Sequence, residues 1–151
     1  MNKILKVILN IILIPWQLPQ IIVGLIILSV LKAKGKLTTV FDYKTSWVFW
    51  HNDPTYTGVS LGPIIILNER NYKDSDLKTV KHEYGHCIQS FILGSIYLLI
   101  IGFVSLVINN LLWKVFYPVL PYFYYSHFPE LWADQLGGVL KPGQKTRYDK
   151  I

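Results

Sequence analysis

Three long stretches of this chain contain no charged residue, and they dominate its pattern of apolar and polar positions. They run from Val7 to Leu31, from Cys87 to Trp113 and from Val115 to Pro129. An apolar helix of about 20 residues is long enough to cross the hydrocarbon core of a bilayer. Since a chain of 151 residues cannot bury three such stretches in its own core, the pattern predicts contact with a membrane.

Two prolines, Pro15 and Pro19, divide the first stretch into pieces that are too short to span a bilayer as helices. Lysines flank both outer ends of the stretch, and lysine-rich flanks are typical of the cytoplasmic side. Two interpretations stay open, namely a re-entrant hairpin with its tip at residues 15–19 and a single kinked span.

The second and third stretches predict a helical hairpin that dips into the membrane and returns. Residues 87 to about 109 as a helix extend roughly 35 Å, which is close to one hydrocarbon thickness. Asn109 and Asn110 form a polar pair at which the chain can turn, and residues 111–127 can then return. The basic tail is expected on the same side as Lys32, Lys34 and Lys36.

Between the apolar stretches lies a more polar segment whose sequence is typical of β-strands. Residues 38–50 alternate and are rich in Val, Phe, Tyr and Trp, and residues 58–67 predict a second strand. Pro63 has no N–H to donate, which predicts that this strand lies at an edge or carries a bulge. The pattern predicts a small antiparallel sheet that leads into a helix capped by Ser75.

These elements predict one membrane-associated α+β domain over residues 1–151. Its parts are an N-terminal membrane segment (1–37), a small β-sheet (38–70), a helix that runs into the membrane (74–113), a return segment with a further helix (114–140) and a basic tail (141–151).

Composition and charge narrow the class of protein. Hydrophobic residues make up 52% of the chain and charged residues only 16%, which excludes intrinsic disorder. The net charge is +6, but 13 of the 15 basic residues are lysines, and several of these lysines flank the apolar stretches. A nucleic-acid-binding protein favours arginines on a contiguous basic face, so we expect membrane lipid as a partner and no nucleic acid. Cys87 is the single cysteine, which excludes an intrachain disulfide and a cysteine-rich zinc site.

The helix predicted after the sheet carries the sequence His82-Glu83-Tyr84-Gly85-His86, an HExxH motif. Side chains four residues apart share one helix face, so both imidazoles can reach one metal ion. Glu83 can then contact a metal-bound water, take its proton and deliver it to a leaving amine. The alternative is a solvated helix face with two incidental histidines. Polar groups at a membrane margin are costly without partners, which favours a metal site with a third protein ligand.

Glu130 is the candidate third ligand. Pro129 is expected at the first helical position, and Glu130 and Asp134, four residues apart, share one face of the helix that follows. Glu130 can bind the metal while Asp134 accepts the second ring N–H of a ligand histidine. The alternative is an amphipathic helix with two solvated acids. Acidic residues are scarce in this chain, which favours the ligand role.

The motif pair HExxH and ExxAD resembles the gluzincin pattern, and within that group the integral-membrane peptidases of the CAAX prenyl protease type. The chain is also similar to small uncharacterised bacterial membrane proteins that share Ser60-Leu61-Gly62, Gln89-Ser90 after the motif and the run 130–138. The resemblance implies Zn²⁺ as cofactor, His82, His86 and Glu130 as its ligands, Glu83 as general base and a supporting Asp134. The chain is much shorter than the CAAX-type enzymes, so their substrate class is not carried over.

We therefore expect a minimal zincin-like unit that hydrolyses peptide bonds of a protein or peptide, located at the bacterial cytoplasmic membrane with its site facing the cytoplasm. His127 or Tyr125 could donate a hydrogen bond to the developing oxyanion, although such tyrosines more often form an interfacial belt. A site-2-protease-like enzyme is one alternative, but the Leu-Asp-Gly-type motif of its third ligand does not occur in this chain. A non-catalytic metal-binding membrane protein is another, in which Glu83 has no role.

Overall fold

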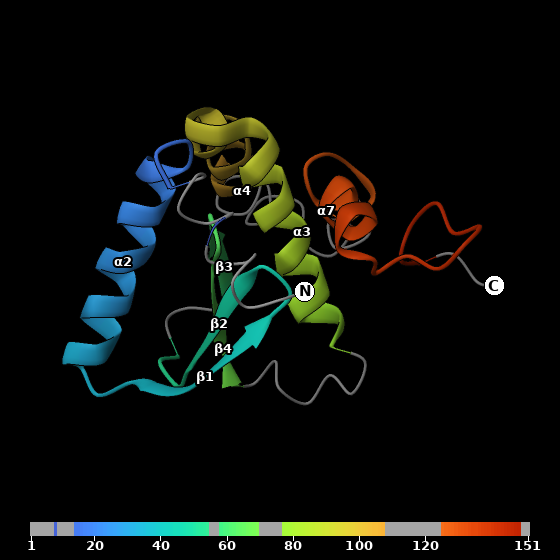
Figure 1. Cartoon of the computed structure of the whole chain (residues 1–151). Coiled ribbons are helices and arrows are strands. Elements are labelled where there is room, and N and C mark those ends of the chain that lie inside the picture. The colour runs from blue at the N-terminus through green and yellow to red at the C-terminus, as the bar shows by residue number, and fades with distance from the viewer. Residues whose placement is uncertain (1–7, 9–13, 55–57, 70–76, 108–124, 149–151) are drawn as a thin grey trace.

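A computed structural model describes residue 8 and residues 14–54, 58–69, 77–107 and 125–148. Four helices and a four-stranded sheet make up most of this part (Figure 1). In chain order the elements are α2 (Leu18–Ala33), β1 (Leu37–Tyr43), β2 (Ser46–His51), β3 (Gly58–Leu61), β4 (Ile64–Asn68), α3 (Lys78–Leu93), the 3₁₀ turn η2 (Gly94–Ile96), the π-helical turn η3 (Leu98–Gly102), α4 (Phe103–Val107) and α7 (Glu130–Gly137). The predicted α+β class is confirmed.

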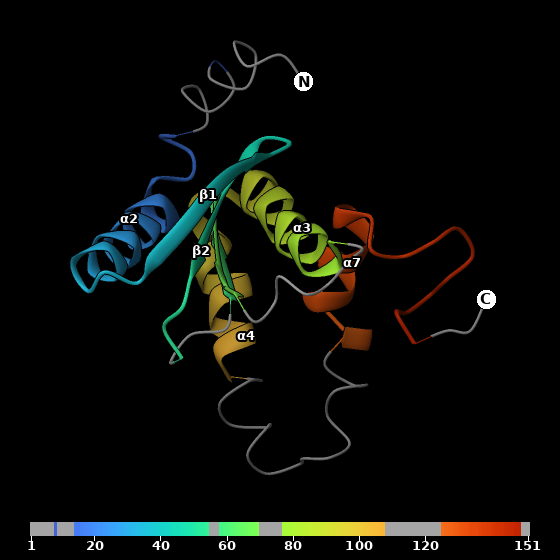
Figure 2. The same ribbon diagram turned by 90° about the horizontal axis from the view of Figure 1, so that it is seen from below.

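The sheet is covered by α2 on one face and by α3 on the other, as seen from below in Figure 2. Successive residues of a strand point to opposite faces, and β4 supplies both cores. Ile64 and Ile66 pack with Leu28 and Leu31 of α2, whereas Ile65 and Leu67 pack in the core beneath α3. Because both faces are covered, β4 is buried throughout, and its first four residues are all apolar rather than alternating.

The strand order is β1-β2-β4-β3, and the sheet is mixed. The pairs β1–β2 and β3–β4 are antiparallel, but β2 and β4 run parallel, so the prediction of an antiparallel sheet is wrong. Each of the two predicted strands is in fact a hairpin. The first turns at Lys44 and Thr45, which carry no glycine or asparagine signal, and the second turns at Gly62 and Pro63. Gly62 accommodates this turn with a φ of 65°.

Helix α3 begins at Lys78 and ends at Leu93. Its N-cap is Leu77, so the prediction of Ser75 as the cap is wrong; Ser75 itself lies outside the described residues. Gly94, with a φ of 57°, ends the helix, and a Cβ at this position would lie 2.2 Å from Trp16 Cε2. The prediction of one straight helix from residue 87 to about 109 is therefore wrong, because the chain bends where Gly94 meets the Trp16 ring. The predicted turn at residues 109–110 and nearly all of the return segment lie outside the described residues.

Among the described residues, no single helix is both long enough and apolar enough to cross a membrane. One helix pair, Lys78–Ile96 with Leu98–Ser105, meets both criteria when taken together, and its two parts are bent by 113°. The predicted membrane-embedded hairpins are not supported by these elements.

Candidate metal centre

Helix α3 carries the HExxH motif along the face of the sheet. Val80, Tyr84 and Cys87 pack into the core with β2 and β4, which fixes the rotation of the helix about its axis. His82 and His86 consequently share the other side of α3, and their ring centroids lie 4.8 Å apart.

Helix α7 crosses α3 so closely that the two backbones touch. A Cβ on Gly85 would lie 1.9 Å from the carbonyl oxygen of Ala133, and a Cβ on Gly137 would lie 1.9 Å from that of Lys81. Glycine at both positions permits this close packing of the two helices. Helix α7 begins at Glu130, with Pro129 as its N-cap. The crossing thus brings the first residue of α7 over the two histidines.

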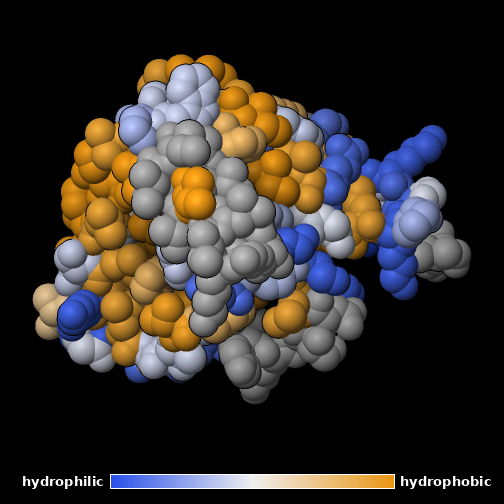
Figure 3. Space-filling model, in the orientation of Figure 1, coloured by the Kyte–Doolittle hydropathy of each residue, from blue (hydrophilic) through white to orange (hydrophobic). Residues whose placement is uncertain are grey.

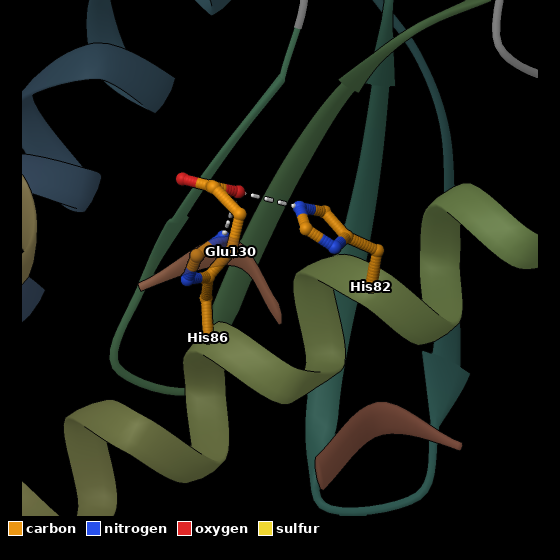
Figure 4. A group of neighbouring side chains, drawn as sticks. All are labelled: His82, His86 and Glu130. Carbon is orange, nitrogen blue, oxygen red and sulfur yellow. Dashed lines mark hydrogen bonds and ion pairs between the residues drawn. The ribbon is translucent and has the colours of Figure 1, made fainter. Parts of the chain in front are cut away.

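His82, His86 and Glu130 converge on one point (Figure 4). Oε2 of Glu130 lies 3.0 Å from Nε2 of His82 and 3.2 Å from Nε2 of His86. All three residues are buried. Two ligands about 2.0–2.1 Å from a tetrahedral zinc ion lie about 3.4 Å apart, which is close to both contacts of Glu130. All three ligand atoms lie within 4.8 Å of one another, and the donor types fit such an ion.

The far side of each imidazole has an acceptor of its own. Nδ1 of His82 lies 2.7 Å from Oδ1 of Asp134, and Nδ1 of His86 lies 2.8 Å from Oε1 of Gln89. Gln89 is fixed in turn, because its Nε2 donates to the carbonyl oxygen of Pro129. With the protons on Nδ1, both Nε2 lone pairs face the point that Glu130 shares.

Two of these partners were not assigned a role from the sequence. Gln89 lies one helical turn after His86, and that spacing was a usable signal. Ser105 on α4 donates a hydrogen bond of 3.0 Å to Oε1 of Glu130. Nothing in the uncharged sequence around Ser105 indicated this contact.

Glu83 points to the sheet side of the centre. Oγ of Ser60 on β3 donates to Oε2 of Glu83 at 2.6 Å, and β3 is the edge strand next to α3. Glu83 is half-buried and lies outside the converging trio.

The two proposed oxyanion donors differ in their positions. The Tyr125 ring packs edge-on against His82, with centroids 5.6 Å apart, whereas His127 is exposed.

The two carboxylates of the centre, Glu130 and Asp134, stabilise positive charge beside them. Burial alone would lower the pKa of His82, but hydrogen bonds with Asp134 and Glu130 outweigh it and raise the pKa to about 9. Burial would raise the pKa of Glu130, yet its hydrogen bonds with both histidines bring that pKa below its usual range. Burial raises the pKa of the Cys87 thiol to about 12, so it stays protonated at neutral pH, unlike a metal-binding thiolate.

Comparisons of the chain with models of protein families, with curated proteins and with solved structures found no match.

Proposed function

We propose that this chain is a membrane-associated, zinc-dependent peptidase with His82, His86 and Glu130 as metal ligands. One observation carries the proposal: two Nε2 atoms and a carboxylate oxygen, all buried, converge on one point, and Glu83 lies next to the first histidine outside this group. Three protein ligands leave a fourth position for water, as in catalytic zinc sites, whereas structural sites are closed by four protein ligands.

Each residue then has a distinct task. Zn²⁺ at this point would supply Lewis acidity and lower the pKa of a bound water molecule. Glu83 accepts the proton of the attacking water and passes it to the leaving amine. Ser60 restrains the Glu83 carboxylate through their hydrogen bond. Tyr125, whose ring packs against His82, would donate a hydrogen bond from its hydroxyl to negative charge that develops on the scissile carbonyl.

The test is Glu83→Gln, which keeps the shape of the side chain and removes its basicity. We expect this variant to retain stoichiometric zinc and to lose cleavage of a peptide library by about 10²-fold or more. Glu69→Gln is the matched control, because Glu69 is exposed at the end of β4 and the change in charge is the same. A Glu83→Gln variant that cleaves as well as the wild type would refute the proposal, and a zinc-binding wild type that cleaves nothing would support the non-catalytic alternative.

The membrane part of the proposal is supported by the exposed side of α2. Its buried side combines the polar Gln20 with Ile21, Leu28 and Leu31, and the preceding Gln17 is buried too, whereas most of its exposed side is apolar. The exposed apolar side chains are Leu18, Ile22, Val23, Leu25, Ile26 and Val30. A helix in water presents polar groups outward, but a helix in lipid must satisfy its polar groups inside the protein.

The amide groups of Gln17 and Gln20 both have hydrogen-bond partners inside the protein, although Oε1 of Gln20 has none among the described residues. Nε2 of Gln20 donates to Oγ of Ser90 and to the carbonyl oxygen of Gly94, and Ser90 donates to Oε1 of Gln17. The indole of Trp16 donates to the carbonyl oxygen of Phe91. These bonds fasten the start of α2 to the bend after α3.

The exposed apolar side of α2 continues over that bend. Figure 3 shows hydrophobic side chains over the left of the molecule, where α2 lies, and over the top, where α3 bends into α4. The bend exposes Phe91, Ile92, Ile96, Leu99 and Phe103. We name these five residues and the six exposed apolar residues of α2 the apolar face. Contiguous apolar surfaces of this kind mark interaction sites, and we propose lipid as the partner of this one.

A further inference from the structure

Arg147 belongs to the basic tail, but its guanidinium group lies beside Asp134, which contacts the His82 ring nitrogen that faces away from Glu130. Helix α7 ends at Gly137, and the next residue, Gly138, has a φ of 77° that reverses the chain. A second turn follows, in which Gln144 N–H donates to the carbonyl oxygen of Lys141. The tail then brings Arg147 back to the helix that it has just left.

The guanidinium group of Arg147 donates hydrogen bonds to both oxygens of the Asp134 carboxylate. Nε of Arg147 donates to Oδ2 of Asp134 at 2.7 Å, and Nη2 donates to Oδ1. Asp134 is fully buried, while the side chain of Arg147 is 27% exposed. Two parallel N–H···O bonds between a planar fork and a carboxylate fix orientation as well as charge.

Arg147 is held on one further side, because its Cζ lies 3.6 Å from the centroid of the Tyr125 ring. Its Nη2 also lies 3.1 Å from Nδ1 of His82, but this contact is not a hydrogen bond while Nδ1 carries the proton that it donates to Asp134. Stacking on an aromatic face restricts a guanidinium group that would otherwise be mobile. The guanidinium group of Arg147 therefore binds groups of the protein rather than substrate.

We infer that Arg147 is a positioning residue for the metal centre and acts through Asp134. Because Arg147 donates to both oxygens of Asp134, Oδ1 stays in place to accept the Nδ1 proton of His82. This hydrogen bond in turn keeps Nε2 of His82 oriented toward Glu130. Arg147 also compensates the charge of a buried carboxylate, which is costly to leave unpaired. This inference rests on the metal site of the proposed function.

The experiment measures zinc affinity by competition with a chromophoric chelator, without any substrate. We expect Arg147→Met to weaken zinc binding by about 10–100-fold, the usual effect of losing an outer-shell partner. Arg147→Lys keeps the charge but not the fork, and we expect it to recover only part of that loss. Lys141→Met removes an exposed cation from the same tail and should bind zinc like the wild type.

A double-mutant cycle tests whether Arg147 acts through Asp134. Adding Arg147→Met to Asp134→Ala should cause no further loss of zinc affinity, and additive losses would overturn the inference. The absorption spectrum of bound Co²⁺ is a second readout, and we expect it to change in Arg147→Met but not in Lys141→Met. If Arg147→Met does not fold, Arg147→Lys decides the matter, because wild-type affinity and an unchanged Co²⁺ spectrum in that variant would also overturn the inference.

The inference and the proposed function can fail separately. A wild-type protein that binds zinc but cleaves no peptide would overturn the function and leave the affinity comparison intact. Arg147 variants that bind zinc like the wild type would overturn the positioning role and leave the function standing.

Discussion

At the scale of single residues, each histidine of the centre is held at both ring nitrogens. His82 lies between Glu130 and Asp134, and His86 lies between Glu130 and Gln89. An imidazole fixed in this way loses little rotational freedom when it binds a metal, so the site is largely formed in advance.

This arrangement predicts a graded loss of zinc when the residues are truncated one at a time. His86→Ala and Glu130→Ala each remove a ligand atom and should lose most of the zinc at micromolar protein. Asp134→Ala removes only a partner of His82 and should weaken affinity by about 10–100-fold. Metal analysis after gel filtration measures the ligand variants, and chelator competition measures Asp134→Ala, with Glu69→Ala as the control. Stoichiometric zinc in Glu130→Ala would move the third ligand elsewhere, with Asp134 the first residue to examine.

At the scale of elements, the site depends on how closely α7 approaches α3. Gly85 and Gly137 leave no room for a Cβ at the crossing. Glu130 and the histidines come from different helices, so a small change in the separation of the helices displaces one ligand from the other two.

Gly85→Ala should therefore push α7 away from α3 and damage the site. Overpacking of this kind costs about 1–3 kcal/mol of folding free energy, and we expect most zinc binding to be lost with it. Gly102→Ala is the matched control, since a Cβ there meets only the Leu98 side chain, 3.6 Å away. Urea unfolding and zinc analysis of both variants check the prediction. Wild-type stability and zinc content in Gly85→Ala would show that the helices do not cross as closely as described.

At the scale of the whole molecule, the sheet lies between two helices with different surroundings. Helix α3 is covered in part by α7, whereas α2 presents the apolar face outward (Figures 1 and 3). The bend after α3 belongs to the same face, and Ser105 of α4 contacts Glu130. The metal centre and the apolar face are thus joined through one short segment of chain.

The apolar face predicts binding to lipid vesicles, tested by flotation with vesicles that contain an anionic lipid. Lys32, Lys34 and Lys36 lie at the end of α2 and should favour such lipids. Ile26→Glu places a charge on the apolar face and should lower the bound fraction. Val40→Glu is the matched control, because Val40 is 54% exposed and Ile26 58%, and Val40 on β1 lies outside the apolar face. A wild-type protein that stays in the aqueous fraction, or equal binding by both variants, would contradict the assignment of lipid as partner.

The sequence alone determined features that depend on short spacings. The four-residue spacing of His82 and His86, and of Glu130 and Asp134, places each pair on one helix face wherever the helices lie. The scarcity of acids made Glu130 stand out. The close packing at Gly85 could also be predicted, because a glycine inside a helix commonly marks a place where another element packs closely against that helix. The α+β class followed from the contrast between alternating and continuously apolar segments.

The tertiary structure decided everything that depends on contacts between distant parts of the chain. The parallel pairing of β2 with β4 arises from the summed packing of two hairpins, and no short pattern encodes it. The bend at Gly94 depends on the Trp16 ring, which lies far away in the sequence. Ser105 and Arg147 reach the centre only because the chain returns to it twice, from α4 and from the tail. A hydrogen bond between distant residues leaves no periodic trace in a sequence, so these partners of Glu130 and Asp134 become visible only in the fold.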